Sequence, residues 1–274
     1  MNTTLVTCIL AGLFLVICFF AVKRIRYWLS EGEKIKHPGY TSPHVSSWAR
    51  VIRLRLGRLV AYLKVGRLVV IGKENLNYPG RLLITPNHQN EKDAVAMTAA
   101  LGTRHYRFLM AVDQITPIRA PLVAWLGGIA VHENNPGASV RAAINALKAE
   151  QDSSILIFPQ GRLVKDNTLS REDFFSGALM IGKHAAKKSK APFALLPMAI
   201  YYHRRPDHAT LLFKLADRFG ISWFSTWFNE TTYGATVAIG KPIPLSELPD
   251  DLDAATDVLF EQVKALSHLA ESAS

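Results

Sequence analysis

Short, mainly apolar runs alternate with longer segments of helical periodicity over most of this chain. Strands are predicted for the short runs at residues 68–71, 81–84, 155–158, 193–200 and 236–239. Helices are predicted for the periodic segments at residues 91–101, 137–151, 175–188 and 253–270. Such alternation is typical of an α/β domain, in which helices flank a mostly parallel sheet. We therefore expect one α/β domain over residues 66–274.

The N-terminal part of the chain contains one long uncharged stretch. Residues 5–22 include no charged side chain, and at about 1.5 Å per residue a helix of this length just crosses the core of a bilayer. The sequence KRIRYW follows at residues 23–28, whereas a cleaved signal peptide carries its positive charge before the apolar part. We therefore predict a transmembrane anchor in residues 1–28 of a single-pass protein, with the domain on the cytoplasmic face, at the inner membrane in a bacterium. The alternative is an apolar helix that packs on protein or lies in the membrane interface.

A linker and a basic amphipathic helix are predicted for residues 29–65. Residues 30–47 are polar and are interrupted by Pro38 and Pro43, which is typical of a connecting segment. In residues 48–64, basic side chains lie off an apolar face that is formed by Trp48, Val51, Ile52, Leu59, Tyr62 and Leu63. Two interpretations are open: this face contacts anionic membrane lipid beside the anchor, or it packs on the domain.

Net charge and cysteine content narrow the range of partners. The formal charge of +10 favours an acidic partner, but no nucleic-acid-binding motif accompanies it, so we expect no nucleic acid partner. Cys8 and Cys18 both lie within the apolar stretch, so the rest of the chain has no disulfide framework and no thiolate metal site. We expect neither a metal nor a cofactor. Residues 219–228 hold five aromatic side chains, which form either core or a further membrane contact.

A candidate catalytic pair follows the second predicted strand. His88 and Asp93 lie in a loop that leads into the next predicted helix, which is where α/β folds place reactive groups. The Asp93 carboxylate can fold back onto Nδ1 of His88 and leave Nε2 to accept a proton as a general base. The alternative is a surface histidine near a helix-capping aspartate. Because the sequence has no Gly-x-Ser-x-Gly motif and no cysteine in the domain, no covalent acyl-enzyme is expected.

Four short blocks occur in order along the predicted domain. They are NHQNEKD at 87–93, GGIAV at 127–131, FPQGR at 158–162 and LPMAI at 196–200. Over roughly residues 66–245, the chain resembles the glycerolipid acyltransferase family, which includes the 1-acyl-glycerol-3-phosphate acyltransferases. The first block matches the family's Asn-His-x-x-x-x-Asp pattern in full. The resemblance implies that His88 deprotonates the hydroxyl of a lysophospholipid or related acceptor, that Asp93 stabilises the imidazolium, and that the alkoxide attacks an acyl thioester of coenzyme A or acyl carrier protein.

Two of the blocks depart from the family pattern. The third is usually Phe-Pro-Glu-Gly-Thr-Arg, but here Gln160 replaces the glutamate and Arg162 directly follows Gly161. The second commonly ends in an arginine, where this chain has Glu133 after His132. The resemblance implies that those arginines hold the phosphate of a small acceptor. The acceptor of this chain therefore need not be plain lysophosphatidic acid.

Substrate contacts are expected from Asn87, Gln160, Gly161 and Arg162. The guanidinium of Arg162 offers a planar fork for phosphate, and Gly161 permits a tight turn that brings backbone N–H groups near the substrate. The oxyanion of the tetrahedral intermediate needs donors, which N–H groups at a helix N-terminus can supply. Three other functions are compatible with the same residues. They are acyl transfer to a non-glycerolipid acceptor, transacylation from phospholipid, and lipid binding by a member of the fold that has lost its activity.

Overall fold

The computed structural model describes residues 3–150, 152–165, 167–187, 191–203, 218–220 and 234–274, and for residues 3–10 the backbone alone. Two helices come first, α1 (Thr3–Lys34) and α2 (Ser47–Lys64). The strands are β1 (Leu68–Ile71), β2 (Arg81–Pro86), β3 (Tyr106–Ala111), β4 (Gly128–Val131), β5 (Ser154–Leu156), β6 (Phe193–Tyr202), β7 (Ala235–Ile239) and β8 (Ile243–Pro244). The helices of the domain are α3 (Asp93–Leu101), α4 (Ala120–Trp125), α5 (Pro136–Ala149), α6 (Gly177–Ala186) and α9 (Leu252–Ser272).

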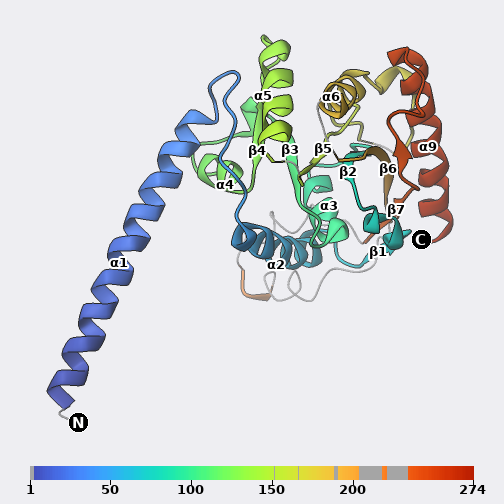
Figure 1. Ribbon diagram of the computed structural model, residues 1–274. Helices are drawn as coiled ribbons and strands as arrows, with labels where there is room; N and C mark the ends of the chain where they lie inside the picture. The colour runs from blue at the N-terminus through green and yellow to red at the C-terminus, as the bar shows by residue number, and fades with distance from the viewer. Residues whose placement is uncertain (1–2, 151, 166, 188–190, 204–217, 221–233) are drawn as a thin grey trace.

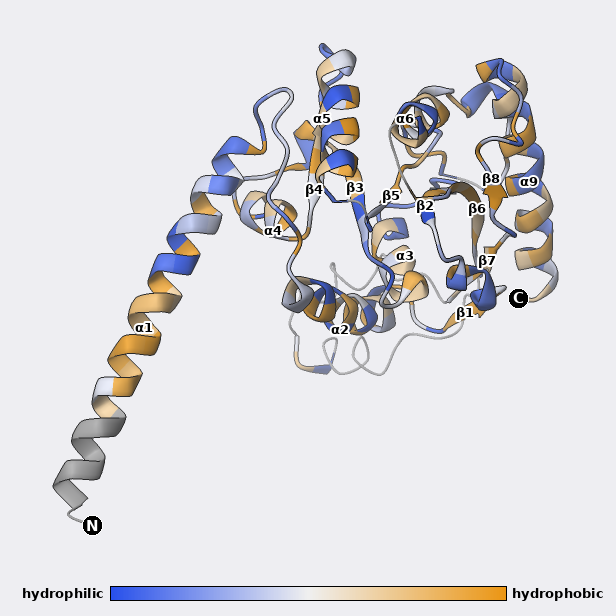
Figure 2. Cartoon of the chain, in the orientation of Figure 1, coloured by the Kyte–Doolittle hydropathy of each residue, from blue (hydrophilic) through white to orange (hydrophobic). Residues whose placement is uncertain are grey.

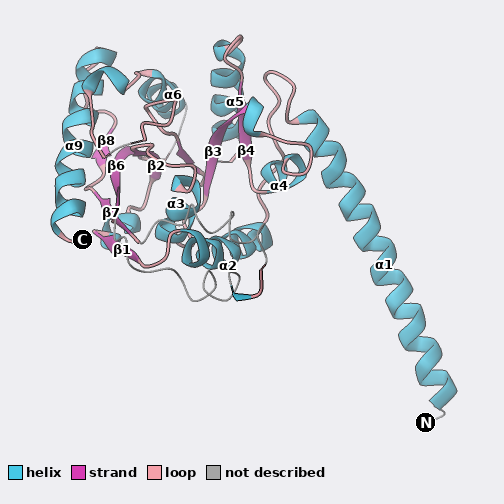
Figure 3. Cartoon of the chain, turned by 180° about the vertical axis from the view of Figure 1, so that it is seen from behind, coloured by secondary structure: helices cyan, strands magenta, loops and turns pink. Residues whose placement is uncertain are grey.

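The strands form one mostly parallel sheet, in the order β1-β7-β6-β2-β5-β3-β4 with β8 beside β6 (Figure 1). Among the strands described, β6 pairs with β7 and with β8 in the antiparallel sense, and the other pairs are parallel. Helices α5, α6 and α9 lie on one side of the sheet, and α3 lies on the other with α2 outside it (Figures 1 and 3). Within β2, Leu83 packs in the core under α5, α6 and α9, whereas Leu82 and Ile84 pack with α3, as alternate residues of a strand do. The predicted α/β class is confirmed.

The apolar pattern missed three strands, β3, β4 and β8. β3 has the sequence YRFLMA, in which Arg107 interrupts the apolar run although its side chain is buried. β4 has only four residues and begins at a glycine, and β8 has two. Of the predicted helices, α3 begins at Asp93 rather than at residue 91. Most of the aromatic run at 219–228 lies outside the described residues, so neither interpretation of it is tested.

Helix α1 extends away from the domain (Figure 1). Its large apolar side chains between Leu13 and Leu29 are mostly exposed, and Figure 2 shows the apolar part of the helix beyond a polar part nearer the domain. Over the described residues, none of the helices combines the length and the apolarity that crossing a bilayer requires. The predicted transmembrane helix is therefore not confirmed. Residues 5–10 of that prediction lie outside the described side chains.

The segment between α1 and α2, predicted as a linker, packs against the domain. Ile35 and Val45 in this segment are fully buried. Just before it, α1 passes so close to α4 that a Cβ on Gly32 would lie 2.6 Å from the backbone nitrogen of Pro121. Trp28 packs on the same small core as Ile35. The connection between α1 and α2 is thus part of the folded domain.

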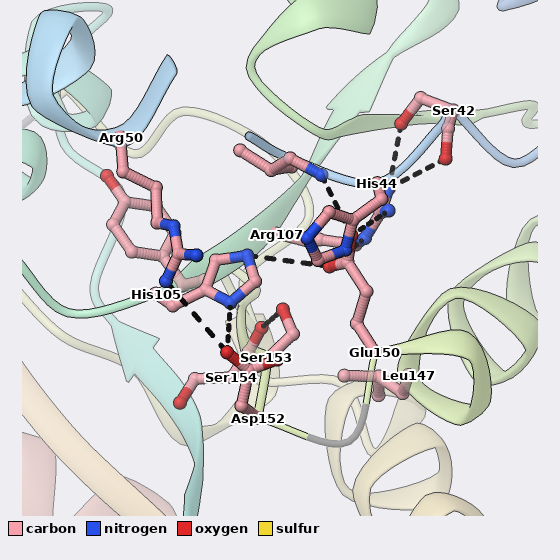
Figure 4. Close-up of polar contacts among 12 residues, drawn as sticks. Ser42, His44, Arg50, His105, Arg107, Leu147, Glu150, Asp152, Ser153 and Ser154 are labelled. Carbon is pink, nitrogen blue, oxygen red and sulfur yellow. Dashed lines mark hydrogen bonds and ion pairs between the residues drawn. The ribbon is translucent and has the colours of Figure 1, made fainter. Parts of the chain in front are cut away.

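A buried ion pair holds this segment to the sheet (Figure 4). Arg107 donates from Nε and Nη2 to the two carboxylate oxygens of Glu150, at 2.9 and 2.8 Å. Nη1 of Arg107 also donates to the carbonyl and hydroxyl oxygens of Ser42, and Glu150 accepts a hydrogen bond from the Val45 backbone N–H at 2.9 Å. Nδ1 of His44 lies 2.7 Å from the same Glu150 oxygen. We call this pair, with its contacts to residues 42–45, the Arg107–Glu150 clamp.

Helix α2 turns its apolar face outward. Trp48 is 77% exposed and Tyr62 is 70% exposed, and Val51 and Leu59 on the same face are exposed too. By contrast, Arg53 is buried: Nη1 donates to the Tyr106 carbonyl at 2.8 Å, and its guanidinium lies 3.9 Å from the centre of the Tyr106 ring. The interpretation in which the apolar face packs on the domain is therefore wrong. The residues of α2 that are buried against the domain are Ala49, Leu54, Ala61 and this one arginine, whose charge is satisfied by backbone carbonyls.

Candidate active site

The first sequence block lies where β2 ends and α3 begins. All six residues of β2 are buried, and the chain leaves the strand at the carboxyl end of the parallel sheet. The Asn87 side chain fixes the exit by donating from Nδ2 to the Ile200 carbonyl at 3.0 Å and accepting from the Ile200 N–H at 2.7 Å. Asn87, which we expected to contact substrate, is instead fully buried and ties this loop to β6.

His88 and Asp93 form a hydrogen-bonded pair in this loop. Nδ1 of His88 lies 2.9 Å from Oδ2 of Asp93, and the imidazole is 22% exposed while the carboxylate is fully buried. The same Oδ2 accepts hydrogen bonds from the backbone N–H groups of Gln89 at 2.6 Å and Asn90 at 2.9 Å. Asp93 is the first residue of α3, so its charge also lies at the positive end of the helix dipole. Because Nδ1 of His88 is bound to Asp93, Nε2 is the ring nitrogen that this contact leaves for another partner.

The third sequence block packs directly beneath His88. The Phe158 ring stacks on the imidazole with centroids 4.1 Å apart, and Oε1 of Gln160 accepts a hydrogen bond from the His88 N–H at 2.5 Å. The Val164 N–H donates to the His88 carbonyl at 2.8 Å. Gly161 makes the turn between these contacts with φ of +63°, a conformation that favours glycine. First and third blocks therefore form one unit.

Gln160 contains one polar atom that has no hydrogen-bond partner in the part of the chain that the structure describes. Its side chain is fully buried, and because Oε1 is bound to the His88 N–H, the amide orientation is fixed. Nε2 has no hydrogen-bond partner among the described residues. A glutamate at this position would present an oxygen where this chain presents an N–H donor.

Arg162 lies at the surface. Its side chain is 71% exposed and pairs with Asp173 at 2.7 Å. An exposed ion pair of this kind contributes little stability, so an anionic ligand can compete with Asp173 for the guanidinium. Arg171, farther along this loop, pairs with Asp257 on α9.

The second and fourth blocks occupy different strands of the sheet. The fourth lies on β6 next to β2 and supplies the Ile200 contact to Asn87. The second lies on β4, which β5 and β3 separate from β2. Beyond it, His132 and Glu133 line a shallow hollow at the carboxyl ends of β3 and β4, together with Asp113. The structure thus joins three blocks around His88 and places the second farther along the same edge.

One residue of the site was not found from the sequence. The Tyr202 hydroxyl donates to Oδ1 of Asp93 at 2.5 Å, and the tyrosine is almost fully buried. Burial raises the pKa of Tyr202 well above its usual value, and the Asp93 charge raises it further, so the phenol stays protonated. Because the two residues are 109 positions apart, only the pairing of β6 beside β2 reveals the contact.

Comparison with known proteins identifies the domain. Residues 67–201 match the family model described as Acyltransferase. Residues 67–201 form a domain of the acyltransferase family. This confirms the acyltransferase membership that the four sequence blocks indicated.

The fold of this acyltransferase is also found in a solved structure. The crystal structure of the 1-acyl-sn-glycerophosphate (LPA) acyltransferase PlsC from Thermotoga maritima matches with a TM-score of 0.56 and 20% identity, covering 80% of this chain and 79% of that one. At this identity the likeness concerns the fold. No curated protein matches the sequence. Within the described ranges, no group of three or more His, Cys, Asp or Glu side chains is arranged to hold a metal ion.

Proposed function

We propose that this acyltransferase transfers a fatty acyl group from a thioester of coenzyme A or acyl carrier protein to the hydroxyl of a lysophospholipid or related glycerolipid. The observation that carries the proposal is the His88–Asp93 pair, with Nδ1 and Oδ2 2.9 Å apart at the carboxyl end of β2. The fold shared with an LPA acyltransferase supports a lysolipid acceptor.

The pair can act as a general base. His88 takes the hydroxyl proton at Nε2, and the new imidazolium is stabilised by the buried Asp93 carboxylate. Four hydrogen bonds to that carboxylate hold it in place beside the imidazole. The acceptor oxygen then bonds to the thioester carbonyl carbon, the carbon–sulfur bond breaks, and the proton on His88 passes to the leaving sulfur.

The oxyanion of this reaction requires hydrogen-bond donors. The N–H groups of Gln89 and Asn90, in the loop before α3, already donate to Asp93. The buried Nε2 of Gln160 is a donor still without a partner among the described residues. We propose that Gln160 and the turn at Gly161 contact the reacting groups, and that Arg162 exchanges Asp173 for an anionic acceptor head group.

The function is tested by incubating the purified full-length protein with labelled acyl-CoA or acyl carrier protein and a panel of lysolipids. We expect label on the acceptor hydroxyl, with acceptors that carry a phosphate preferred. Transfer to a non-glycerolipid acceptor alone, or from phospholipid without added thioester, would replace this substrate assignment. Lipid binding without any transfer would overturn the catalytic proposal.

We propose that α1 and α2 hold the enzyme on the cytoplasmic face of a membrane. Two observations support this: the apolar side chains of α1 point outward along most of its length, and α2 exposes Trp48 and Tyr62. Basic residues of α2 next to this face, such as Arg55 and Arg58, suit anionic lipid head groups. The apolar part of α1 would lie in the bilayer and the α2 face in the interface.

The contribution of α2 is tested in a variant that begins at Lys23. Replacing both Trp48 and Tyr62 with serine should lower its partition onto anionic vesicles about tenfold or more, because two large apolar side chains no longer enter the interface. Leu269→Ser on α9 is the control, since it removes another exposed apolar side chain. Vesicle cosedimentation measures both, and equal binding of the two variants would dismiss α2 as a membrane contact.

A further inference from the structure

Tyr202 completes the hydrogen bonding of the buried aspartate. It is the last residue of β6 and is 7% exposed, and its hydroxyl lies 2.5 Å from Oδ1 of Asp93. The other carboxylate oxygen, Oδ2, faces His88 and the two backbone donors. Building on the proposed function, we propose that Tyr202 is a positioning residue that fixes the Asp93 carboxylate and sets how strongly His88 accepts a proton.

The geometric part of this role is to give each carboxylate oxygen its own partners. The carboxyl group of an aspartate rotates about a single bond, and a rotation would bring Oδ1 to His88 and break the contacts of Oδ2. The Tyr202 hydroxyl opposes that rotation from the side of Oδ1. It is the only partner of Oδ1 among the described residues, so its removal would leave a buried carboxylate oxygen without a donor.

The second part of this role is electrostatic: the Tyr202 hydroxyl weakens the hold of His88 on its proton. A hydroxyl that donates to Asp93 withdraws part of the negative charge that would otherwise stabilise protonated His88. Without the hydroxyl, His88 should hold its proton to higher pH. The phenol can donate at any pH the enzyme meets, because burial and then the Asp93 charge raise the pKa of Tyr202 well above its usual value.

The strand provides a matched control in the neighbouring residue. Tyr201 points to the opposite face of β6, where its hydroxyl donates to Oε1 of Glu271 at 3.1 Å, an exposed contact. Tyr201→Phe and Tyr202→Phe therefore each remove one phenol that donates to a carboxylate, from adjacent positions of one strand. Only the second carboxylate belongs to the catalytic pair.

The kinetic test compares these two variants in the acyl transfer assay. Tyr202→Phe should lower kcat about tenfold to hundredfold, the usual loss for a hydrogen bond to a charged group, with a smaller change in KM. It should also move the acid limb of the kcat/KM profile upward by about half a pH unit or more. Tyr201→Phe should change neither quantity. Unchanged kinetics and an unchanged acid limb in Tyr202→Phe would overturn the proposal.

A second measurement needs no turnover, so it separates this inference from the proposed function. The titration of His88 is followed by NMR, with its signal assigned by its loss in His88→Ala. Tyr202→Phe should raise the pKa of His88, and in an Asp93→Asn background the same substitution should have no effect, because the tyrosine acts through Asp93. Equal shifts in both backgrounds, or a Tyr202→Phe protein that is unfolded at the assay temperature, would assign the hydroxyl a structural role instead. If the wild type transferred no acyl group while the His88 shift was observed, the function would fail and the positioning would stand.

Discussion

We expect His88→Ala to lower kcat/KM for acyl transfer by about two to four powers of ten, the usual contribution of a general base. The imidazole contacts Phe158 and Asp93 but contributes no buried core, so the protein stays folded. The measurement is steady-state kinetics with labelled acyl thioester, accompanied by a melting curve.

His268→Ala is the control for this substitution, because His268 is an exposed histidine on α9. It should retain wild-type activity. If the activity of His88→Ala were within a factor of a few of the wild-type activity, the general-base mechanism would be wrong. Loss of activity together with loss of the folded state would call for His88→Gln, which keeps a polar side chain of similar length.

We expect Glu150→Ala to destabilise the fold by about 3–5 kcal/mol, because it leaves the Arg107 guanidinium buried without its counter-ion. Arg107 is 1% exposed, so water cannot replace the lost carboxylate, and the Val45 N–H loses its acceptor as well. This is a large part of the roughly 5–15 kcal/mol that stabilises a typical domain. Chemical denaturation measures it.

Two further variants distinguish the clamp from ordinary surface charge. Glu261→Ala removes an exposed glutamate from α9 and should have almost no effect. Replacing Arg107 and Glu150 together with leucine should recover much of the loss, since no charge is then left buried. A Glu150→Ala protein as stable as wild type would show that the clamp contributes nothing.

The Arg107–Glu150 clamp also predicts how the stability of the fold changes with pH. Burial opposes ionisation of Glu150, but the hydrogen bond and charge of Arg107 lower its pKa below the usual 4.5. A carboxylate whose pKa is lowered by folding stabilises the fold above its unfolded pKa, and this stabilisation is lost as the pH falls through the folded pKa. His105, whose pKa burial lowers from 6.5, acts in the same direction. The stability difference between wild type and Glu150→Gln should therefore shrink below pH 4.5.

The sequence allowed prediction of those features that depend on neighbouring residues. The strand before His88, the helix after it and the fold-back of Asp93 are all local, and the structure contains each of them. β3 was missed because the partner of Arg107 lies 43 residues away at Glu150. Tyr202 was missed for the same reason. A single sequence does not show which residues become neighbours through the sheet.

Helix α2 illustrates a different limit. Periodicity correctly separated its apolar side chains from its basic ones, but periodicity does not say which face a domain will cover. The usual rule would bury the apolar face, whereas here Arg53 is buried and Trp48 exposed. The buried guanidinium is accommodated because carbonyl groups at Tyr106 and Arg104 accept its hydrogen bonds and the Tyr106 ring lies under it.

The close approach of Gly32 to Pro121 has a mechanical consequence. The junction between α1 and the domain is tightly packed, because Gly32 has no room for even one added carbon and the clamp holds residues 42–45. Helix α1 has 32 residues and is about 48 Å long at 1.5 Å per residue. The contact at Gly32 therefore sets the orientation of the whole helix relative to the domain. Inserting a single residue between the apolar part and Gly32 would rotate the apolar part by about 100° about the helix axis relative to the domain, so the number of residues in α1 determines which of its side chains face the same way as the exposed side chains of α2.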